Sequence, residues 1–185
     1  TYEQLINADS ASQQLIRPMV IGDDVRRYRI EQKNRFMIVI PSGWSSEQCG
    51  MPPREQDANK ANREQKAWQW FARSYPALAN HLLPFEAAAR KRWDRGEFWW
   101  ELRPCDYYHL FEQPKIVYPD IALESRFTID TQGFYAANTV YTLPMEDYYL
   151  LALLNSRLIF TYMQQKTTVL GDAEARGRLR FIAQY

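Results

Sequence analysis

The hydrophobic pattern of the second half of the chain constrains its fold more than any other feature of the sequence. Short runs of apolar and β-branched residues, separated by turn-forming residues, are typical of β-strands. They occupy residues 115–118, 126–130, 133–135 and 139–143. Thr131-Gln132-Gly133 predicts a tight hairpin turn, because glycine readily takes a positive φ angle. We therefore expect short, mainly antiparallel strands in this half of the chain.

Helical signals dominate the rest of the chain. Residues 145–164 predict one long helix, because leucines and Tyr162 recur at spacings of three and four. Capping residues, prolines at first helical positions and apolar spacing predict further helices at residues 10–16, 54–74, 76–82 and 84–95. One buried strand is expected at residues 35–40, followed by a loop at 42–53. The predicted fold class is α+β, with short strands packed against several helices.

Length and composition indicate an ordinary globular domain. A chain of 185 residues buries about 70% of its unfolded surface without needing a disulfide or a metal. Its 46% apolar and 24% charged residues exclude a disordered or fibrous protein. No apolar stretch approaches the roughly 18 residues of a membrane span. The opening Thr1-Tyr2-Glu3-Gln4 is neither a start methionine nor a signal sequence. We expect one domain over residues 1–185, cut from a larger protein, with a mostly helical sub-lobe at 1–95 and a β-rich one at 96–185.

Charge and cysteine usage indicate which surfaces and which cellular location to expect. The formal net charge is +1, but residues 22–36 and 157–180 are locally basic, whereas residues 101–130 are acidic. Such a distribution fits local basic faces on a neutral average. Cys49 and Cys105 form no Cys-x-x-Cys pair, which favours a reducing, cytoplasmic location over a disulfide framework. His81 and His109 have no ligand at metal spacing, so we predict no metal site.

The sequence lacks the common catalytic motifs. It has no Gly-x-Gly-x-x-Gly, no phosphate-binding Gly-x-x-x-x-Gly-Lys and no Gly-x-Ser-x-Gly. Asp120 and Glu124 with Arg126 resemble the paired carboxylates and cation that hold Mg²⁺ in a nuclease, although the acids are only four residues apart. The alternative interpretation is that these three residues lie in a surface loop between strands. We predict no catalytic residue in this chain.

Aromatic residues make up 15% of the chain and include six tryptophans. Trp93 and the Phe98-Trp99-Trp100 run lie close in sequence to Arg90 and Arg92. Two interpretations fit this pattern: a stacking platform for single-stranded nucleic acid, or a core seam with its arginines on the outside. Large aromatic side chains are mostly buried in a domain of this size, which favours the core.

A series of motifs follows one order along most of the chain. They are Ile16-Arg17-Pro18 with 21–28, Tyr75-Pro76-Ala77-Leu78 with His81-Leu82, Phe85-Glu86 and Arg90, then 99–104, 114–121, Phe134-Tyr135, Asn138-Thr139 and 149–156. With these motifs the chain resembles the TaqI-like C-terminal specificity domain, the target-recognition domain of adenine-specific DNA methyltransferases and of single-chain restriction-modification enzymes. The catalytic Asn-Pro-Pro-Tyr type motif of such enzymes is not in this chain, and Met51-Pro52-Pro53-Arg54 is not a version of it.

The resemblance implies that double-stranded DNA and the parent's own catalytic domain are the partners of this chain. That separate domain would bind S-adenosylmethionine and methylate the N6 atom of a flipped adenine. A fused nuclease domain, if the parent has one, would use Mg²⁺. This chain would need no cofactor of its own and would read the DNA sequence. The alternative is that the chain is a protein-interaction module of the same restriction-modification enzyme. An exposed apolar patch would favour this alternative.

The candidate DNA-binding residues are basic or amide side chains at expected turns, at strand ends or beside the aromatic cluster. They are Arg26, Arg27, Arg90, Arg92, Arg103, Lys115, Arg126 and Asn138. Arginine pairs bidentately with guanine and asparagine with adenine, and each such contact discriminates between bases by about 1–3 kcal/mol. Any one of these residues can also be an ordinary surface charge, and Lys115 can pair with Asp120 or Glu124 instead.

Overall fold

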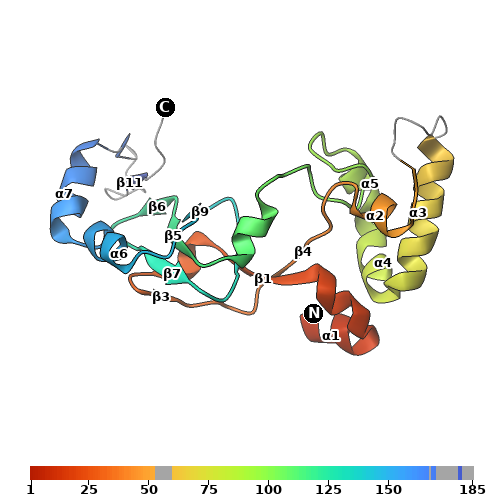
Figure 1. Ribbon diagram of the computed structural model, residues 1–185, viewed down its shortest axis with the longest axis horizontal. Helices are drawn as coiled ribbons and strands as arrows, with labels where there is room; N and C mark the ends of the chain where they lie inside the picture. The colour runs from red at the N-terminus through yellow and green to blue at the C-terminus, as the bar shows by residue number, and fades with distance from the viewer. Residues whose placement is uncertain (53–59, 167, 170–178, 181–185) are drawn as a thin grey trace. The chain divides into compact units, whose positions relative to one another are not determined.

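The computed structural model describes residues 1–52, 60–166, 168–169 and 179–180. The chain forms two compact units (Figure 1). Unit 1 comprises Thr1–Arg17 and Phe36–Asp106, and unit 2 comprises Pro18–Arg35 and Tyr107–Tyr185. The predicted sub-lobes, 1–95 and 96–185, differ from these units, because residues 18–35 leave the helical first half and join the strands of the second half.

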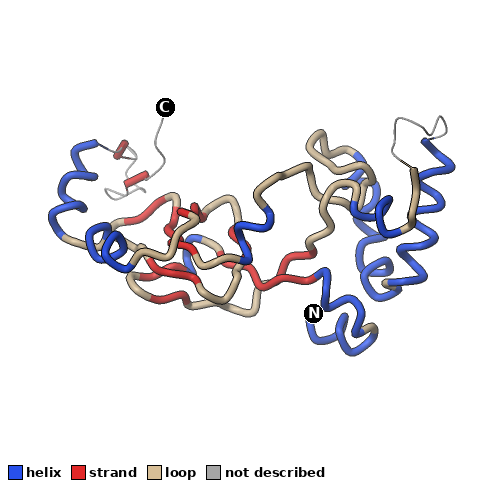
Figure 2. The backbone as a smooth tube through the Cα atoms, in the orientation of Figure 1, coloured by secondary structure: helices blue, strands red, loops and turns tan. Residues whose placement is uncertain are grey.

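Unit 1 is mostly helical (Figure 2). Its elements are α1 (Tyr2–Ala8), η1 (Ser10–Leu15), β4 (Phe36–Ile38), α2 (Trp44–Gln48), α3 (Lys60–Ser74), α4 (Pro76–Leu82), η4 (Leu83–Phe85) and α5 (Glu86–Arg90). Asp9 caps η1 by accepting a hydrogen bond from the Ala11 N–H, and Pro76 occupies the first turn of α4, as the sequence predicts. The expected loop at 42–53 contains helix α2. The last helix of this group ends at Arg90 rather than at residue 95, and residues 54–59 of the predicted helix 54–74 lie outside the described residues.

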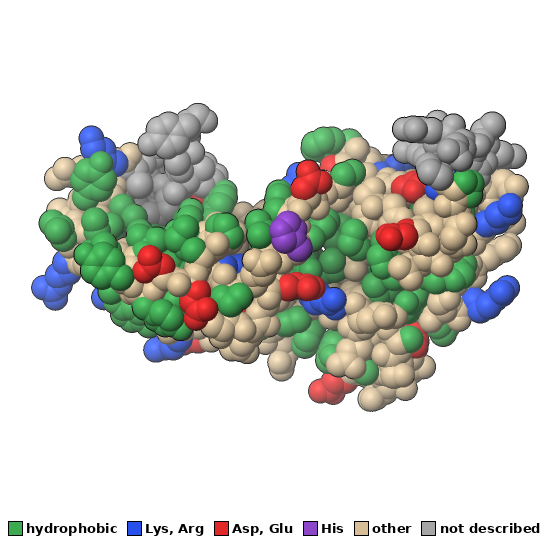
Figure 3. Space-filling model, in the orientation of Figure 1, with side chains coloured by type: hydrophobic (Ala, Val, Ile, Leu, Met, Phe, Trp, Pro, Cys, Tyr) green, Lys and Arg blue, Asp and Glu red, His purple; other side chains and the backbone are tan. Residues whose placement is uncertain are grey.

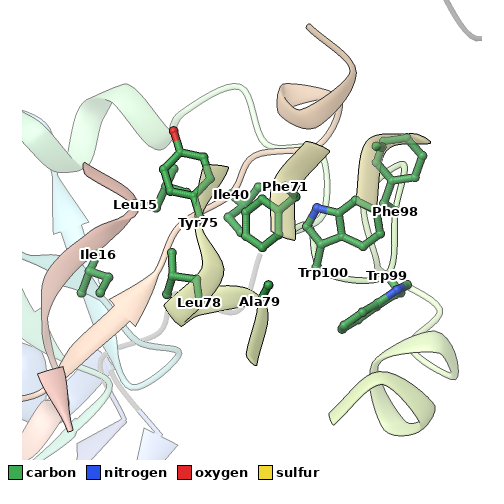
Figure 4. Close-up of a cluster of buried hydrophobic side chains, with 11 residues drawn as sticks. Leu15, Ile16, Ile40, Phe71, Tyr75, Leu78, Ala79, Phe98, Trp99 and Trp100 are labelled. Atoms are coloured by element: carbon green, nitrogen blue, oxygen red, sulfur yellow. The ribbon is translucent and has the colours of Figure 1, made fainter. Parts of the chain in front are cut away.

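The core of unit 1 is built from aromatic side chains (Figure 4). Phe71 of α3, Leu78 of α4 and Tyr75, which lies between these helices, form one buried cluster. Ile40 and residues 98–100 belong to the same cluster. The rings of Trp99 and Trp100 lie 4.8 and 5.0 Å from the ring of Trp68. The prediction that the 98–100 aromatics belong to the core is therefore confirmed. Trp93 does not join them, because its side chain is 93% exposed.

A buried carboxylate fixes the segment that carries these aromatics. Glu101 is fully buried and accepts hydrogen bonds from the N–H groups of Gly43 at 3.0 Å, Ser45 at 3.0 Å and Phe98 at 3.2 Å. Two of these donors belong to the start of α2, where a carboxylate satisfies N–H groups that the helix leaves unbonded. Burial raises the pKa of the Glu101 carboxyl, and these hydrogen bonds oppose the rise. The chain approaches Glu101 so closely that a Cβ atom on Gly96 would lie 2.6 Å from the Glu101 Cβ.

Unit 2 contains most of the strands. β5 (Lys115–Pro119) is central to a sheet of order β7-β5-β9 and runs antiparallel to β7 (Thr128–Asp130) and β9 (Val140–Leu143). β2 (Val25–Arg26) and β3 (Arg29–Ile30) form a hairpin. The 3₁₀ turn η2 (Gly22–Asp24) precedes this hairpin, and η5 (Tyr108–Glu112) precedes β5. The α+β class and the four strands predicted in the second half are confirmed, with bounds that differ by one or two residues: β8 is Tyr135–Ala136, and β5 extends to Pro119.

Two further sheets contain the other described strands of unit 2. β1 (Ile16–Val20) runs parallel to β8 (Tyr135–Ala136), with Met19 opposite Tyr135. β11 (Leu179–Arg180) pairs with both β6 (Ile121–Ala122) and β10 (Thr168–Val169). No helix among the described residues is long and apolar enough to span a membrane.

The hairpin predicted at Thr131-Gln132-Gly133 is wrong, although Gly133 does take a positive φ of 74°. β7 pairs with β5, and β8 pairs with β1, so the two strands flanking this turn are not partners. Asp130 explains the difference. Its carboxylate accepts hydrogen bonds from the N–H groups of Gln132 and Phe134, both at 2.8 Å, which turns the chain away from β7.

The single helix predicted for residues 145–164 is also wrong, because the chain breaks into α6 (Tyr148–Leu154) and α7 (Arg157–Lys166). The buried Asn155 makes the break. Its side chain accepts a hydrogen bond from the N–H of Phe127 at 3.2 Å and donates one to the carbonyl of the same residue at 2.9 Å. Ser156 then caps the new helix by accepting a hydrogen bond from the N–H of Ile159.

The hydrogen bonds of Glu101 give a first prediction. Glu101→Ala leaves three buried N–H groups without an acceptor, and we expect it to lower the free energy of unfolding of unit 1 by about 3 kcal/mol. All six tryptophans lie in unit 1, so tryptophan fluorescence during urea denaturation follows this unit alone. Glu47→Ala removes an exposed carboxylate from α2 and is the matched control. Equal stability of the two variants would contradict the prediction.

The raised pKa of Glu101 gives a second prediction, on pH. A carboxyl with a higher pKa in the folded than in the unfolded chain stabilises the fold when protonated. That stabilisation is complete below the ordinary value of 4.5 and is lost as pH rises through the raised folded-state pKa. Glu101→Gln stays neutral throughout. We therefore expect the stability of the natural chain relative to Glu101→Gln to fall as the pH rises above 4.5 in urea titrations. A constant difference would show that burial does not control this carboxyl.

Candidate nucleic-acid interface

Unit 2 brings three segments together around one hollow of about 470 Å³. The segments are the turn η2, residues 119–126, and the turn before β9. Carboxylate, guanidinium and hydroxyl groups all reach the wall of the hollow, from Asp23, Asp120, Arg126 and Thr139. The hollow therefore offers both hydrogen-bond donors and acceptors to whatever enters it.

Backbone contacts fix the walls of this hollow. The N–H of Gly22 donates to the Thr139 hydroxyl at 2.9 Å, and the N–H of Asp120 donates to the Thr139 carbonyl at 2.9 Å. A Cβ atom on Gly22 would lie 3.0 Å from that carbonyl oxygen, so the close approach favours glycine. The turn carrying Asn138 and Thr139 is therefore joined directly to the other two segments. Asn138 itself is exposed.

The β2–β3 hairpin lies against residues 125–127. Arg27 Nε donates to the Ser125 carbonyl at 3.4 Å, and the N–H of Tyr28 donates to the Phe127 carbonyl at 3.1 Å. Arg126 lies between these two anchor points in the sequence and lines the hollow. Three of the predicted residues, Arg26, Arg27 and Arg126, thus lie on adjoining segments of one unit.

Carboxylates neutralise much of the positive charge around this hairpin. Arg26 and Arg29 both pair with Glu31, at 3.3 and 2.6 Å, and the hydrogen bond from Arg29 lowers the pKa of Glu31. Arg35 pairs with the buried Asp24 at 2.6 Å. Arg27 differs from these arginines. It is exposed, and no carboxylate of the described residues pairs with it.

Lys115 is not at the surface. Its side chain is 1% exposed, and Nζ donates to Asp130 Oδ2 and to the Phe111 carbonyl, both at 2.5 Å. The buried ammonium cannot reach a DNA groove, so the structure contradicts its assignment as a DNA contact. The suggested pairing with Asp120 or Glu124 is also wrong, because the partner is Asp130. A lysine at the first residue of a strand gives no local sign of burial, and its partner lies 15 residues away.

The remaining predicted residues, Arg90, Arg92 and Arg103, belong to unit 1. Arg90 pairs with Glu64 and Glu86, and its guanidinium carbon lies 5.9 Å from the ring centre of Trp99. Arg92 donates to the backbone carbonyls of Trp99 at 3.0 Å and Glu101 at 2.9 Å. These contacts hold the aromatic segment in place. Arg103 follows this segment and is exposed.

The predicted nuclease-like carboxylates do not form a metal cluster in the part of the chain that the structure describes. Glu124 is exposed and pairs with Arg126 at 3.2 Å. No group of three or more His, Cys, Asp or Glu side chains there is placed to hold a metal ion. Asp120 instead forms part of the wall of the hollow.

Sequence reasoning missed several residues of this region. Asp23 and Thr139 line the hollow, and Tyr28 has an unusual backbone conformation, with φ of 66°. The pairing that closes the hollow joins residues 117 positions apart, which no local pattern reveals. Of the residues that line the hollow, the sequence had singled out Asp120 and Arg126.

The chain belongs to the family of the TaqI-like C-terminal specificity domain, whose family model matches residues 17–174. It is also similar to a solved structure of the Type IIL restriction-modification enzyme MmeI in complex with DNA, with a TM-score of 0.50 and 18% sequence identity. That match covers 98% of this chain and 21% of that chain, so this chain spans about a fifth of the length of MmeI. At this identity the likeness shows the fold. No curated protein matches this chain.

The buried Lys115–Asp130 pair gives a third prediction. Lys115→Met keeps the apolar stem but leaves the Asp130 carboxylate buried without a cation. We expect unit 2 to lose about 3–5 kcal/mol of stability, because a buried charge without its partner is strongly destabilising. Amide hydrogen exchange of β5 measures this loss. Arg126→Met, which breaks a pair with the exposed Glu124, is the control and should change stability by about 0.5 kcal/mol or less. Normal protection of β5 in Lys115→Met would contradict the assignment.

Proposed function

We propose that this chain is the sequence-specific double-stranded DNA recognition domain of a restriction-modification enzyme. The observation that carries the proposal is the family match, because residues 17–174 include the β2–β3 hairpin and every segment around the hollow. The fold shared with an enzyme described in complex with DNA supports it. The mixed donor and acceptor groups of the hollow suit the edges of base pairs.

The chemistry of each side chain suggests its role. Arg27, exposed and without a carboxylate partner, suits a phosphate contact that fixes register without reading sequence. Arg126 and Asn138 suit guanine and adenine edges in the major groove. The carboxylates of Asp23 and Asp120 can accept hydrogen bonds from the exocyclic amino groups of cytosine or adenine. Donors and acceptors on one wall distinguish base pairs that a purely basic surface cannot.

The parent protein would supply the chemistry. We propose that a separate domain binds S-adenosylmethionine and methylates the N6 atom of an adenine flipped out of the duplex, as the family resemblance implies. A nuclease domain, where the parent carries one, would use Mg²⁺ and act on the same recognition event. Such an enzyme acts on DNA in the cytoplasm of a bacterial or archaeal cell. This chain would contribute recognition and no catalytic residue.

A second candidate, a protein-interaction module of the same machine, is favoured by the exposed apolar side chains of α6 and α7. Tyr149 is 76% exposed and Leu158 is 78% exposed, and Figure 3 shows hydrophobic side chains gathered over these helices. A contiguous apolar face of this kind marks an interaction surface more often than scattered residues do. DNA recognition remains the leading function, because the matching family is that of a specificity domain and the fold is shared with an enzyme described in complex with DNA.

Selection from a pool of randomised duplexes at low salt tests the proposed function. We expect the chain to enrich one short motif. Arg126→Gln and Asn138→Ala should each relax the preference at one position by about 1–3 kcal/mol. Arg27→Gln should weaken binding to all sequences alike and reduce the slope of log affinity against log salt by about 0.9.

Lys66→Gln is the matched control, since it removes one exposed positive charge from α3 in unit 1. It should leave both motif and affinity unchanged. Retention of duplexes without enrichment would contradict sequence reading and leave only a basic face. Failure to retain any duplex at low salt would overturn the proposal and favour the interaction module.

A further inference from the structure

The turn of the β2–β3 hairpin places a bulky residue in a conformation that normally requires glycine. Arg26 pairs with Arg29, so Arg27 and Tyr28 form a two-residue turn, and Tyr28 has a φ of 66°. The other described non-glycine residue with positive φ is Asn34, at 49°. Asparagine tolerates the left-handed region, whereas a bulky aromatic residue there is an outlier. Tyr28 therefore destabilises the turn that it occupies.

The surrounding structure imposes this conformation. The N–H of Tyr28 bonds to the Phe127 carbonyl at 3.1 Å, and Arg27 Nε bonds to the Ser125 carbonyl at 3.4 Å. At the base of the hairpin, Val25 is fully buried and pairs with Ile30. The backbone of the turn is thus held at its tip and at its base. Strain that is held in this way is characteristic of functional sites.

The Tyr28 side chain does not repay this strain within the fold. Tyr28 is 56% exposed, and its side chain makes no ring contact or hydrogen bond with any residue that the structure describes. More than half of its surface stays in water, so burial within the fold offsets only part of the cost of the strained backbone. An exposed aromatic side chain on a fixed turn is available for a contact outside the chain.

The charges around the ring indicate what that contact is. Arg27 and Arg29 flank Tyr28 on the hairpin and are exposed. Arg29 pairs with Glu31, whereas Arg27 has no carboxylate partner among the described residues. An available cation beside an exposed aromatic ring matches a nucleic acid, where phosphates surround stacked bases. An apolar protein partner would have to desolvate the Arg27 guanidinium group without a phosphate to pair with it.

We propose that Tyr28 is a base-contacting residue that stacks its ring against the bases of the recognised duplex, beside a phosphate held by Arg27. This inference rests on the proposed DNA recognition and deepens it, because it assigns one residue a contact that phosphate binding does not explain. An aromatic side chain on a rigid turn can act as a wedge at a base step. The strained turn fixes the direction of the ring before DNA binds, which lowers the entropic cost of the contact.

The experiment compares Tyr28→Gly, Tyr28→Ala and Tyr28→Phe in the 185-residue chain. The probe is a labelled duplex carrying the sequence selected by the natural chain, and binding is measured by fluorescence anisotropy over a series of salt concentrations. Urea denaturation followed by circular dichroism gives the stability of each variant. Arg27→Gln serves as the reference for a phosphate contact.

Tyr28→Gly should unfold at a higher urea concentration than the natural chain, because glycine relieves the strained φ, and yet bind at least about fivefold more weakly. Tyr28→Ala should lose the same affinity, and Tyr28→Phe should restore it to within about twofold, since stacking needs only the ring. The salt slope should be unchanged in all three variants but lower by about 0.9 in Arg27→Gln.

Three results would overturn the inference. If Tyr28→Gly and Tyr28→Ala bind as tightly as the natural chain, the hairpin contacts only phosphates, and the proposed function stands without this contact. If Tyr28→Phe binds as weakly as Tyr28→Ala, the hydroxyl makes the contact and stacking is wrong. If the natural chain itself binds no duplex at low salt, DNA recognition fails and the role of Tyr28 fails with it.

Discussion

The buried ion pair between Lys115 and Asp130 is the interaction on which the structure of unit 2 depends. The two residues lie opposite each other at one end of the β5–β7 pair. The same carboxylate accepts the N–H groups of Gln132 and Phe134, so it turns the chain out of β7 and towards β8. β8 then pairs with β1, which leads into the turn at the hollow. A buried charge must satisfy all its bonding capacity within the protein, and here that requirement sets the path of the chain.

Unit 1 meets the same requirement with a different result. Glu101 has backbone N–H donors but no cation within its hydrogen-bond contacts, and burial raises its pKa. Backbone dipoles are weaker partners than an ammonium group, so they compensate the cost of burial only in part. In return they connect the start of α2 to the aromatic segment at 98–100, which forms much of the core. In each unit a buried carboxylate thus fixes the path of the chain through the donors that satisfy it.

Local patterns predicted the elements whose partners are near in sequence, and failed where a distant contact decides. The strands β5, β7 and β9, the capping by Asp9 and the helix at Pro76 follow from such patterns. The break at Asn155 does not, because its cause is a pair of hydrogen bonds to Phe127, 28 residues away. Of the site, the sequence predicted Arg26, Arg27, Arg126 and Asn138. The burial of Lys115 and the conformation of Tyr28 depend on the tertiary structure and carry no local signal.

The near-neutral charge of the chain agrees with a domain that reads sequence. A phosphate contact strengthens binding to every sequence equally, so extra exposed arginines raise affinity for the wrong sites as much as for the right one. Around the hairpin, Glu31 and Asp24 hold three of the arginines in ion pairs, while Arg27 keeps its charge available. The carboxylates therefore do more than fix side-chain geometry. Under the proposed DNA recognition, fewer phosphate contacts leave a larger share of the binding free energy to contacts that differ between base pairs, and that difference is what specificity measures.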